Sequence, residues 1–335
     1  MRLCRFPDQR IGLVDGECVR DVTAALASLS AQRYPFPAHD VFIENLPGLR
    51  AVIADAAQSA PALPLDEVRL QSPVANAGKV VAAPVNYKKH LDEARADAEI
   101  HHQNRIAEIQ NVGLFLKATS SIVGPADGIA VRHPDRRTDH EIELAAIIGR
   151  RADRVSRKDA LDHVAGYCIG FDITVRGPEE RSLRKSIDSY TVLGPWLVTA
   201  DEIGNPSGLD LHLSVNGETR QKANTRDLLI DVPALIEWAS SYYTLMPGDV
   251  LLTGTPEGVG PIRPGDVLDA TIEKDRTHAR CRARRVRPPL AWTDPHVTSP
   301  RAAGCCRTST GITASTRTPS WPLRSRSRPD DRSAI

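Results

Sequence analysis

The sequence lacks the features that mark membrane-spanning and secreted chains. Its 335 residues contain no apolar run of about 18 residues or more, and the first ten, MRLCRFPDQR, are too polar for the apolar core of a secretory signal. The six cysteines, at positions 4, 18, 168, 281, 305 and 306, show neither a CxxC pair nor the density of a disulfide scaffold. We therefore expect a cytoplasmic protein with reduced thiols and no membrane association.

Lysine is absent from residue 276 onward, where the chain has thirteen arginines and three acids, Asp294, Asp330 and Asp331. This stretch is rich in Ser, Thr and Pro and follows neither the helical nor the strand period, so no packed structure is predicted. Clustered arginine can neutralise phosphates, but no aromatic residues interleave with the basic ones to support nucleic-acid binding. We favour a tail without selected structure, such as one translated out of frame, and expect no nucleic-acid partner.

The rest of the chain has enough apolar residues for a large core, since 41% of all residues are hydrophobic. Residues 1–75 mix short apolar alternations with alanine-rich helical stretches and thin out into a proline-containing linker, SAPALPLDEVRLQSP. Residues 76–275 carry short β-branched runs punctuated by glycine and proline. We predict a small N-terminal domain over 1–75, the main domain over 76–275 and a disordered Arg/Ser/Pro-rich tail over 276–335.

Local signals predict a hairpin and two helices in the main domain. Asn216-Gly217 follows the alternating run LHLSV and accepts the positive φ angles of a tight hairpin turn. Ser156 begins SRKDALDHVAG with an acid three residues later, the pattern of a capping box. Asp231 begins DVPALIEWASSYYTL with proline in the first turn. Both helical segments have apolar residues at helical spacing.

Two glutamates, Glu141 and Glu143, stand at the head of an apolar run in TDHEIELAAIIGRR. In an extended strand they lie on one face, and Ile142 and Leu144 on the other. Two buried like charges repel, and a divalent cation between them relieves both the repulsion and the desolvation. An edge strand with a solvated acidic face is the commoner reason for an isolated E-x-E motif.

A third acid, Asp172, ends another apolar run in GYCIGFDITVRG, where a lone acid needs a partner to be tolerated. Three carboxylates offer only oxygen ligands, which favour Mg²⁺, Mn²⁺ or Ca²⁺ over zinc. Upstream, NYKKHLDEARADAEIHHQNRIAEIQ is typical of a long polar helix, on which His90 and Glu93 share one face. A carboxylate beside imidazole makes it a better base, although a surface ion pair would show the same spacing.

The order and spacing of these blocks resemble the fumarylacetoacetate hydrolase family over roughly residues 78–274. The matching blocks are NYKKHLDE, LFLKATSSIVGP, DHEIELAAIIG, GYCIGFDITVR, RKSIDSYTVLGPWLVT, VNGETRQ and PGDVLLTGTPEGVGPIRPGD. The resemblance implies a mainly β, α+β catalytic domain, a mixed β-sheet roll or sandwich preceded by the small N-terminal domain. It also implies a homodimer.

The resemblance assigns roles to ten residues. It implies Mg²⁺ or Mn²⁺ on Glu141, Glu143 and Asp172, and a catalytic dyad of His90 and Glu93. The family's two lysines fall on Lys117 and Lys185, and its substrate-lining positions fall on Arg176, Gln221 and Thr255.

The implied activity is hydrolysis of a C–C bond in a 2-oxo or 1,3-dicarbonyl acid, such as an acylpyruvate or a fumarylacetoacetate-like compound. The metal acts as Lewis acid and template, the dyad deprotonates water, and an enolate that the metal stabilises is released. Lys117 and Lys185 offset the developing negative charge. Two alternatives stay open: a decarboxylase or isomerase of muconate-type dioic acids in aromatic catabolism, and a non-catalytic dimeric binding protein with a nucleic-acid-contacting tail.

Some positions depart from the family's commonest pattern. Val175-Arg176-Gly177 replaces Ala-Arg-Asp, Ile187 replaces an aromatic residue, AAPVNY replaces a glycine-containing strand end, and the helix over 91–111 is longer. These changes surround the expected pocket and bear on the substrate rather than on the metal. After DATIEK, where the family has a last strand, the sequence continues as DRTHARCRARRVRPP. If that strand is missing, we expect stability or dimerisation to suffer.

Overall fold

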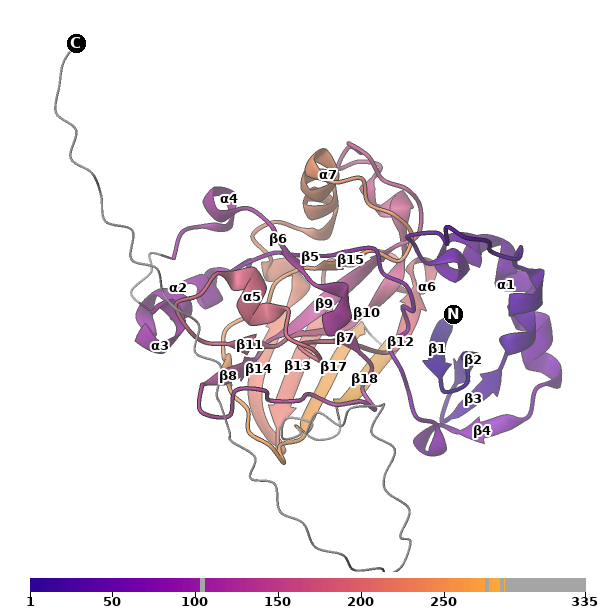
Figure 1. Ribbon diagram of the computed structural model, residues 1–335, viewed down its shortest axis with the longest axis horizontal. Coiled ribbons are helices and arrows are strands. Elements are labelled where there is room, and N and C mark those ends of the chain that lie inside the picture. Colours follow the sequence, from indigo (N-terminus) through magenta and orange to yellow (C-terminus); the bar gives the residue numbers. More distant parts are fainter. Residues whose placement is uncertain (103–105, 275–276, 284–285, 287–335) are drawn as a thin grey trace, which may run out of the picture. The chain divides into compact units, whose positions relative to one another are not determined.

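The computed structural model describes residues 1–102, 106–274, 277–283 and 286, which belong to one compact unit (Figure 1). Mixed β-sheets with helices build it, so the α+β class is confirmed. Strand β1 of the N-terminal segment pairs with β12 of the main domain, which makes the N-terminal strands part of the large sheet. The domain boundary at residues 75 and 76 stays a prediction.

A large mixed sheet forms the centre of the described chain, with β7 (Ile122–Val123) attached in parallel to β12. Its strands, in order across the sheet, are β4 (Ala62–Pro64), β3 (Cys18–Asp21), β2 (Arg10–Asp15), β1 (Arg2–Phe6), β12 (Thr191–Thr199), β10 (Val164–Asp172), β9 (Ile142–Ile148), β15 (Val250–Leu252), β5 (Val80–Ala82) and β6 (Phe115–Lys117).

Two smaller sheets accompany the large one. The first consists of β11 (Thr174–Val175), β8 (Thr138–His140) and β16 (Gly260–Pro261). The second consists of β14 (Glu218–Asn224), β13 (Asp210–Val215), β17 (Leu268–Lys274) and β18 (Thr277–Ala283).

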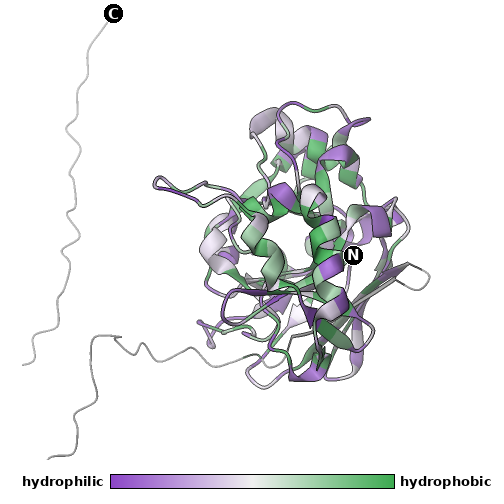
Figure 2. Ribbon diagram, turned by 90° about the vertical axis from the view of Figure 1, so that its right-hand side faces the viewer, coloured by the Kyte–Doolittle hydropathy of each residue, from purple (hydrophilic) through white to green (hydrophobic). Residues whose placement is uncertain are grey.

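Helices of varied length connect these strands. The α-helices are α1 (Val41–Ser59), α2 (Lys88–Ala96), α3 (Ala98–His101), α4 (Ile109–Val112), α5 (Arg181–Lys185), α6 (Ala200–Ile203) and α7 (Val232–Tyr242). Short 3-10 helices are η1 (Thr23–Ser28), η2 (Leu65–Glu67), η3 (Thr119–Ser121), η4 (Ala160–His163) and η5 (Thr225–Asp227). On the side that faces the viewer in Figure 2, α1 carries both hydrophobic residues (green) and hydrophilic residues (purple).

Hydrophobic cores cover both faces of the central strands, because successive side chains of a strand point to opposite faces. Ile142 and Leu144 of β9 belong to a core shared with β13, β17 and α7, whereas Ala145 and Ile147 belong to a second core shared with α1. All seven residues of β9 are buried. The sheet is therefore covered on both faces, as expected of the predicted sandwich.

Two of the local predictions are confirmed. Strands β13 and β14 pair antiparallel, and Asn216 and Gly217 between them have φ angles of 53° and 84°. Helix α7 begins after Asp231, whose side chain accepts a hydrogen bond from the Ala234 amide. Both signals are local, so they do not depend on what the rest of the chain does.

Two other helix predictions are wrong. In SRKDALDHVAG the Ser156 hydroxyl donates to the Asp159 side chain, only the short η4 forms, and Val164 already begins β10. The predicted long polar helix is divided at Asp97, which ends α2 and caps α3 by accepting from the Glu99 amide. Strand pairing overrides helix propensity in the first case, and a side-chain cap starts a new helix in the second.

The segments at the two ends of the main domain also differ from expectation. Residues 62–64 of the predicted linker form β4 and pair with β3, so this segment is an edge strand of the large sheet. Strand β18 pairs with β17 over its whole length, so a strand follows DATIEK here as it does in the family. It lies inside the predicted tail, and residues 287–335 lie outside the described part of the chain.

The cysteines that the structure describes agree with the prediction of reduced thiols. Cys4, Cys18 and Cys168 are free, and burial raises the pKa of Cys4 and of Cys168 to about 12. Among the described residues, no helix combines the length and the hydropathy needed to cross a membrane.

Candidate metal centre

The three acids singled out in the sequence lie on neighbouring strands of the large sheet. Glu143 lies in β9, Glu141 directly precedes it, and Asp172 ends β10. The Asp172 amide donates to the Glu141 carbonyl at 2.9 Å, and Gly170 pairs with Glu143. Because alternate residues share a face, this register places all three carboxylates on the side of the sheet that carries Ala145 and Cys168.

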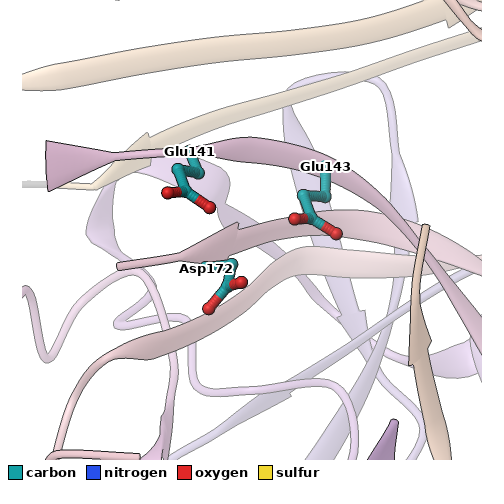
Figure 3. Close-up of side chains that lie close together, drawn as sticks. All are labelled: Glu141, Glu143 and Asp172. Carbon is teal, nitrogen blue, oxygen red and sulfur yellow. The ribbon is translucent and has the colours of Figure 1, made fainter. Parts of the chain in front are cut away.

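The three carboxylates converge on one space. One oxygen from each lies within 4.8 Å of the others, and all three residues are buried. Figure 3 shows the carboxylates of Glu141 and Glu143 beside each other above that of Asp172. Like charges on neighbouring strands destabilise a sheet, so this arrangement requires a compensating charge.

Part of that charge comes from two buried lysines. Lys185 of α5 donates to Glu141 Oε2 and to Asp172 Oδ2, both at 2.7 Å. Lys117 of β6 donates to Asp172 Oδ1 and, at 2.7 Å, to the Tyr190 carbonyl. Burial lowers the pKa of Lys117, against the opposing effect of Asp172. Both predicted lysines are therefore at the carboxylates.

Arg176 supplies a further positive charge and is itself neutralised. Its Nη2 donates to Glu141 Oε1 at 3.0 Å and its Nε to Asp139 Oδ2 at 2.7 Å. Burial disfavours ionisation of Glu141, but Lys185, Arg176 and His90 outweigh this effect and lower its pKa. Arg176 lines the cavity, as predicted, while its charged group is held by two acids.

Glu143 is the least compensated of the three acids. Burial, and then the neighbouring Asp172, raise its pKa well above the usual range. The Gly254 amide donates to its Oε2 at 2.6 Å, and no other hydrogen bond reaches this carboxylate from the described residues. A divalent cation would supply the missing charge, so the oxygen ligands and their electrostatics fit Mg²⁺ or Mn²⁺.

The predicted dyad is formed. His90 Nδ1 lies 2.9 Å from Glu93 Oε2, and Glu93 Oε1 accepts from the Gly258 amide at 2.9 Å. When Nδ1 carries the proton toward Glu93, Nε2 is free to accept one. His90 lines the same cavity as the three acids, so the base and the carboxylates face a common space.

Of the two remaining residues predicted to line the substrate pocket, Thr255 and Gln221, only Thr255 does so. Thr255 lines the cavity, whereas Gln221 does not and is fully hydrogen-bonded. Its Nε2 donates to Thr255 Oγ1 and to the Pro256 carbonyl, and its Oε1 accepts from the Ile142 amide at 3.0 Å. The geometry thus gives Gln221 a positioning contact between the E-x-E segment and the 253–258 loop. Its contact with substrate stays a prediction.

The cavity measures about 60 Å³, and two charged residues that the sequence analysis missed border it. Arg181 and Arg184 precede Lys185 in α5 by four residues and by one. Their spacing from each other places them on one face of a helix, and this spacing was the available signal. Apolar side chains, among them Val85, Ile100 and Ile106, complete the lining.

Comparison with known proteins relates this site to characterised enzymes. Residues 79–284 match the model of the fumarylacetoacetate (FAA) hydrolase C-terminal family. The chain is 55% identical over 278 residues to maleylpyruvate hydrolase of Aquipseudomonas alcaligenes, covering 82% of this chain and 96% of that protein. It is 35% identical over 247 residues to the mitochondrial oxaloacetate tautomerase FAHD2A of Bos taurus. This match covers 70% of this chain and 76% of that protein.

A solved structure shows the same likeness. The crystal structure of maleylpyruvate hydrolase from Sphingobium sp. SYK-6, in complex with manganese(II) and pyruvate, superposes with a TM-score of 0.72. The two sequences are 38% identical, and the match covers 86% of this chain and all of that one.

Proposed function

The chain belongs to the fumarylacetoacetate hydrolase family, and we propose that it is a metal-dependent hydrolase of acylpyruvates with maleylpyruvate as its substrate. Two relatives, one of them 55% identical over nearly its full length, are maleylpyruvate hydrolases, and one of these binds manganese and pyruvate. The observation that carries the proposal is the convergence of Glu141, Glu143 and Asp172 within 4.8 Å beside a histidine base.

We propose Glu141, Glu143 and Asp172 as the ligands of Mg²⁺ or Mn²⁺. When bound, the cation would act as a Lewis acid toward the 2-oxo acid and hold it in place. The observed ion pairs of Lys185 with Glu141 and Asp172 keep these carboxylates oriented toward one another. Gly254 orients Glu143 in the same way.

The dyad supplies the base. His90 Nε2 takes a proton from water, and the hydroxide attacks the acyl carbonyl carbon of maleylpyruvate. The bond between that carbon and the methylene carbon breaks, so its electron pair forms the enolate of pyruvate and the acyl fragment leaves as maleate. His90 then returns its proton to the methylene carbon, which yields pyruvate and restores the base. Glu93 holds the imidazole through Nδ1 throughout.

Lys117 and Lys185 support the charge that develops on the enolate. Both ammonium groups are buried, at 3% and 6% relative exposure, and are fixed by their carboxylate partners. Positive charge held in place near a buried reaction centre stabilises developing negative charge without reorganisation. We assign the two lysines to this role.

The relative that is an oxaloacetate tautomerase favours tautomerisation as a second candidate function. The same base could remove and return a proton at the methylene carbon, and this reaction requires no attack by water. A tautomerase would interconvert the keto and enol forms of oxaloacetate and release no pyruvate.

We also propose that the protein is a homodimer in the cytoplasm, on the family resemblance. Light scattering coupled to size-exclusion chromatography tests the dimer.

The deciding experiment incubates the purified protein with maleylpyruvate and, separately, with oxaloacetate, in Mg²⁺, in Mn²⁺ and in EDTA, and identifies the products by mass. We expect equal amounts of pyruvate and maleate with either metal, and no products in EDTA. Cleavage that persists in EDTA would contradict the metal dependence. Tautomerisation of oxaloacetate without cleavage of maleylpyruvate would assign the second function instead.

A further inference from the structure

The cations around the cavity differ in whether they have acidic partners. Lys185 and Arg176 each form an ion pair with Glu141. Arg181 and Arg184 also line the cavity, yet neither makes an ion pair within the part of the chain that the structure describes. The cavity therefore has two guanidinium groups with no carboxylate at ion-pair distance among the described residues. Glu141 acts on both from farther away and raises the pKa of each less than burial lowers it.

Local contacts hold both groups without removing their charge. Arg184 donates through Nε to the Glu179 carbonyl at 2.8 Å and through Nη1 to the Val175 carbonyl at 3.2 Å. The Arg181 guanidinium lies over the ring of Phe115, 5.4 Å from its centre, and makes no hydrogen bond with a described residue. Carbonyl oxygens and an aromatic face orient a guanidinium but supply no full negative charge.

The two groups are also only partly solvated, because both residues are half-buried. Burial, and then repulsion from Arg176 and Arg181, lower the pKa of Arg184, and burial lowers that of Arg181. Neighbouring half-buried guanidiniums stabilise a fold poorly without an anion, because they lose part of their hydration and repel one another. An incoming carboxylate would form charge-assisted hydrogen bonds with such groups, and arginine suits a planar carboxylate in particular.

Resting on the proposed function, we infer that Arg181 and Arg184 bind the carboxylate at the acyl end of the substrate, so that the enzyme selects acylpyruvates that are dicarboxylic acids. In the proposed function, the cation that Glu141, Glu143 and Asp172 would hold also binds the carboxylate at the pyruvate end. The second carboxylate then needs cations of its own, and the unpaired ones lie on the helix that carries Lys185. Val85, Ile100 and Ile106 offer an apolar wall for the carbons between the two ends.

The test compares maleylpyruvate with acetylpyruvate, which shares the pyruvate end and ends in a methyl group. The measured quantity is the ratio of kcat/KM for maleylpyruvate to kcat/KM for acetylpyruvate. For Arg181→Met and for Arg184→Met we expect this ratio to fall about 10- to 100-fold, the effect of losing one hydrogen bond to a charged group. Arg181→Lys and Arg184→Lys keep the charge but lose the planar guanidinium. Their ratios should lie between those of the wild type and of the methionine variants.

Arg50→Met is the matched control. Arg50 pairs with Asp201 at 2.6 Å on the exposed surface, away from the cavity, and its loss should leave the ratio unchanged. Maleate provides a second measurement, since it should inhibit acetylpyruvate hydrolysis by the wild type. Its inhibition constant should rise at least about tenfold in Arg181→Met and in Arg184→Met.

Two results would overturn the inference while leaving the hydrolase intact. Equal losses on both substrates would mean that the arginines hold the shared pyruvate end or support the fold. Unchanged kcat/KM for both substrates in both methionine variants would mean that the arginines do not contact the substrate. A wild-type protein that cleaves neither substrate would instead contradict the proposed function, and the inference with it.

Discussion

At the scale of single residues, the charge balance of the site determines what it can bind. Glu141 and Asp172 are compensated by lysines from other elements, whereas Glu143 depends on one amide, and burial raises its pKa. Deleting a carboxylate therefore has a different consequence from deleting the base. The two kinds of variant separate metal binding from catalysis.

We expect Glu141→Ala and Asp172→Ala each to abolish hydrolysis and the rise in melting temperature that Mn²⁺ causes, because each removes a proposed ligand. His90→Ala should keep the full metal-dependent rise and still lose hydrolysis, because it removes the base alone. Differential scanning fluorimetry with and without Mn²⁺, together with pyruvate release, measures both properties.

Full turnover of an acylpyruvate by His90→Ala would remove the histidine from the mechanism. That result would favour tautomerisation or decarboxylation, for which attack by water is unnecessary. A metal-dependent rise that survives in Glu141→Ala and in Asp172→Ala would remove these residues from the ligand set.

The residues of this site were predictable to different degrees. Glu141, Glu143 and Asp172 stand out because acids at the ends of apolar runs need a reason to be there, and the structure brings them together. Arg181 and Arg184 carry only the weak signal of their three-residue spacing, and arginines in a polar segment are usually solvent-exposed. Their position is apparent only when α5 is placed against the cavity.

At the scale of secondary-structure elements, β9 and β10 define the site through their register. A shift of one residue would turn Glu143 to the opposite face, toward the core that contains Ile142 and Leu144. Gln221 of β14 fixes this segment from outside by accepting from the Ile142 amide and donating to Thr255. The side chain thus joins three segments at the rim of the site.

We expect Gln221→Leu to weaken Mn²⁺ binding about 10- to 100-fold, because it frees the segment that carries two proposed ligands. It should also cost about 1–3 kcal/mol of stability, because it leaves buried polar groups unpaired. Calorimetric Mn²⁺ titration and thermal unfolding measure the two effects, and exposed Gln58→Leu is the control. Unchanged Mn²⁺ affinity together with a raised KM would contradict this expectation and would support the predicted contact of Gln221 with the substrate.

The secondary-structure elements differ in how well their own sequence predicts them. Helix α7 and the β13–β14 turn have caps and turn residues within a few positions, and both form as predicted. The segment after Ser156 carries a capping pattern too, but β10 pairs with β9 and β12 from Val164 onward and limits it to η4. Pairing between distant strands is not visible in such a short window.

At the scale of the whole molecule, the end of the folded region lies later than the sequence suggested. Strand β18 reaches Ala283 and pairs with β17, whereas composition placed the tail from residue 276. Composition describes an average over many residues and cannot exclude one strand that pairs with a preformed neighbour. The residues that line the cavity all lie at or before Thr255.

We expect a chain ending at residue 286 to keep the melting temperature and the kcat/KM of the full-length protein. A chain ending at residue 275 should lose stability and aggregate, because it leaves the β17 edge unpaired. Scanning calorimetry and maleylpyruvate turnover compare the two truncations. If the chain ending at 286 lost activity, or lost a salt-dependent shift with nucleic acid that the full chain shows, the tail would have a function.

The account depends most on one divalent cation at the three carboxylates, and anomalous diffraction from crystals grown with Mn²⁺ tests it directly. We predict one manganese peak with an oxygen of Glu141, of Glu143 and of Asp172 in its coordination sphere, at about 2.0–2.2 Å as for similar small hard cations. A peak elsewhere, or no peak at saturating Mn²⁺ while maleylpyruvate is still cleaved, would contradict the account.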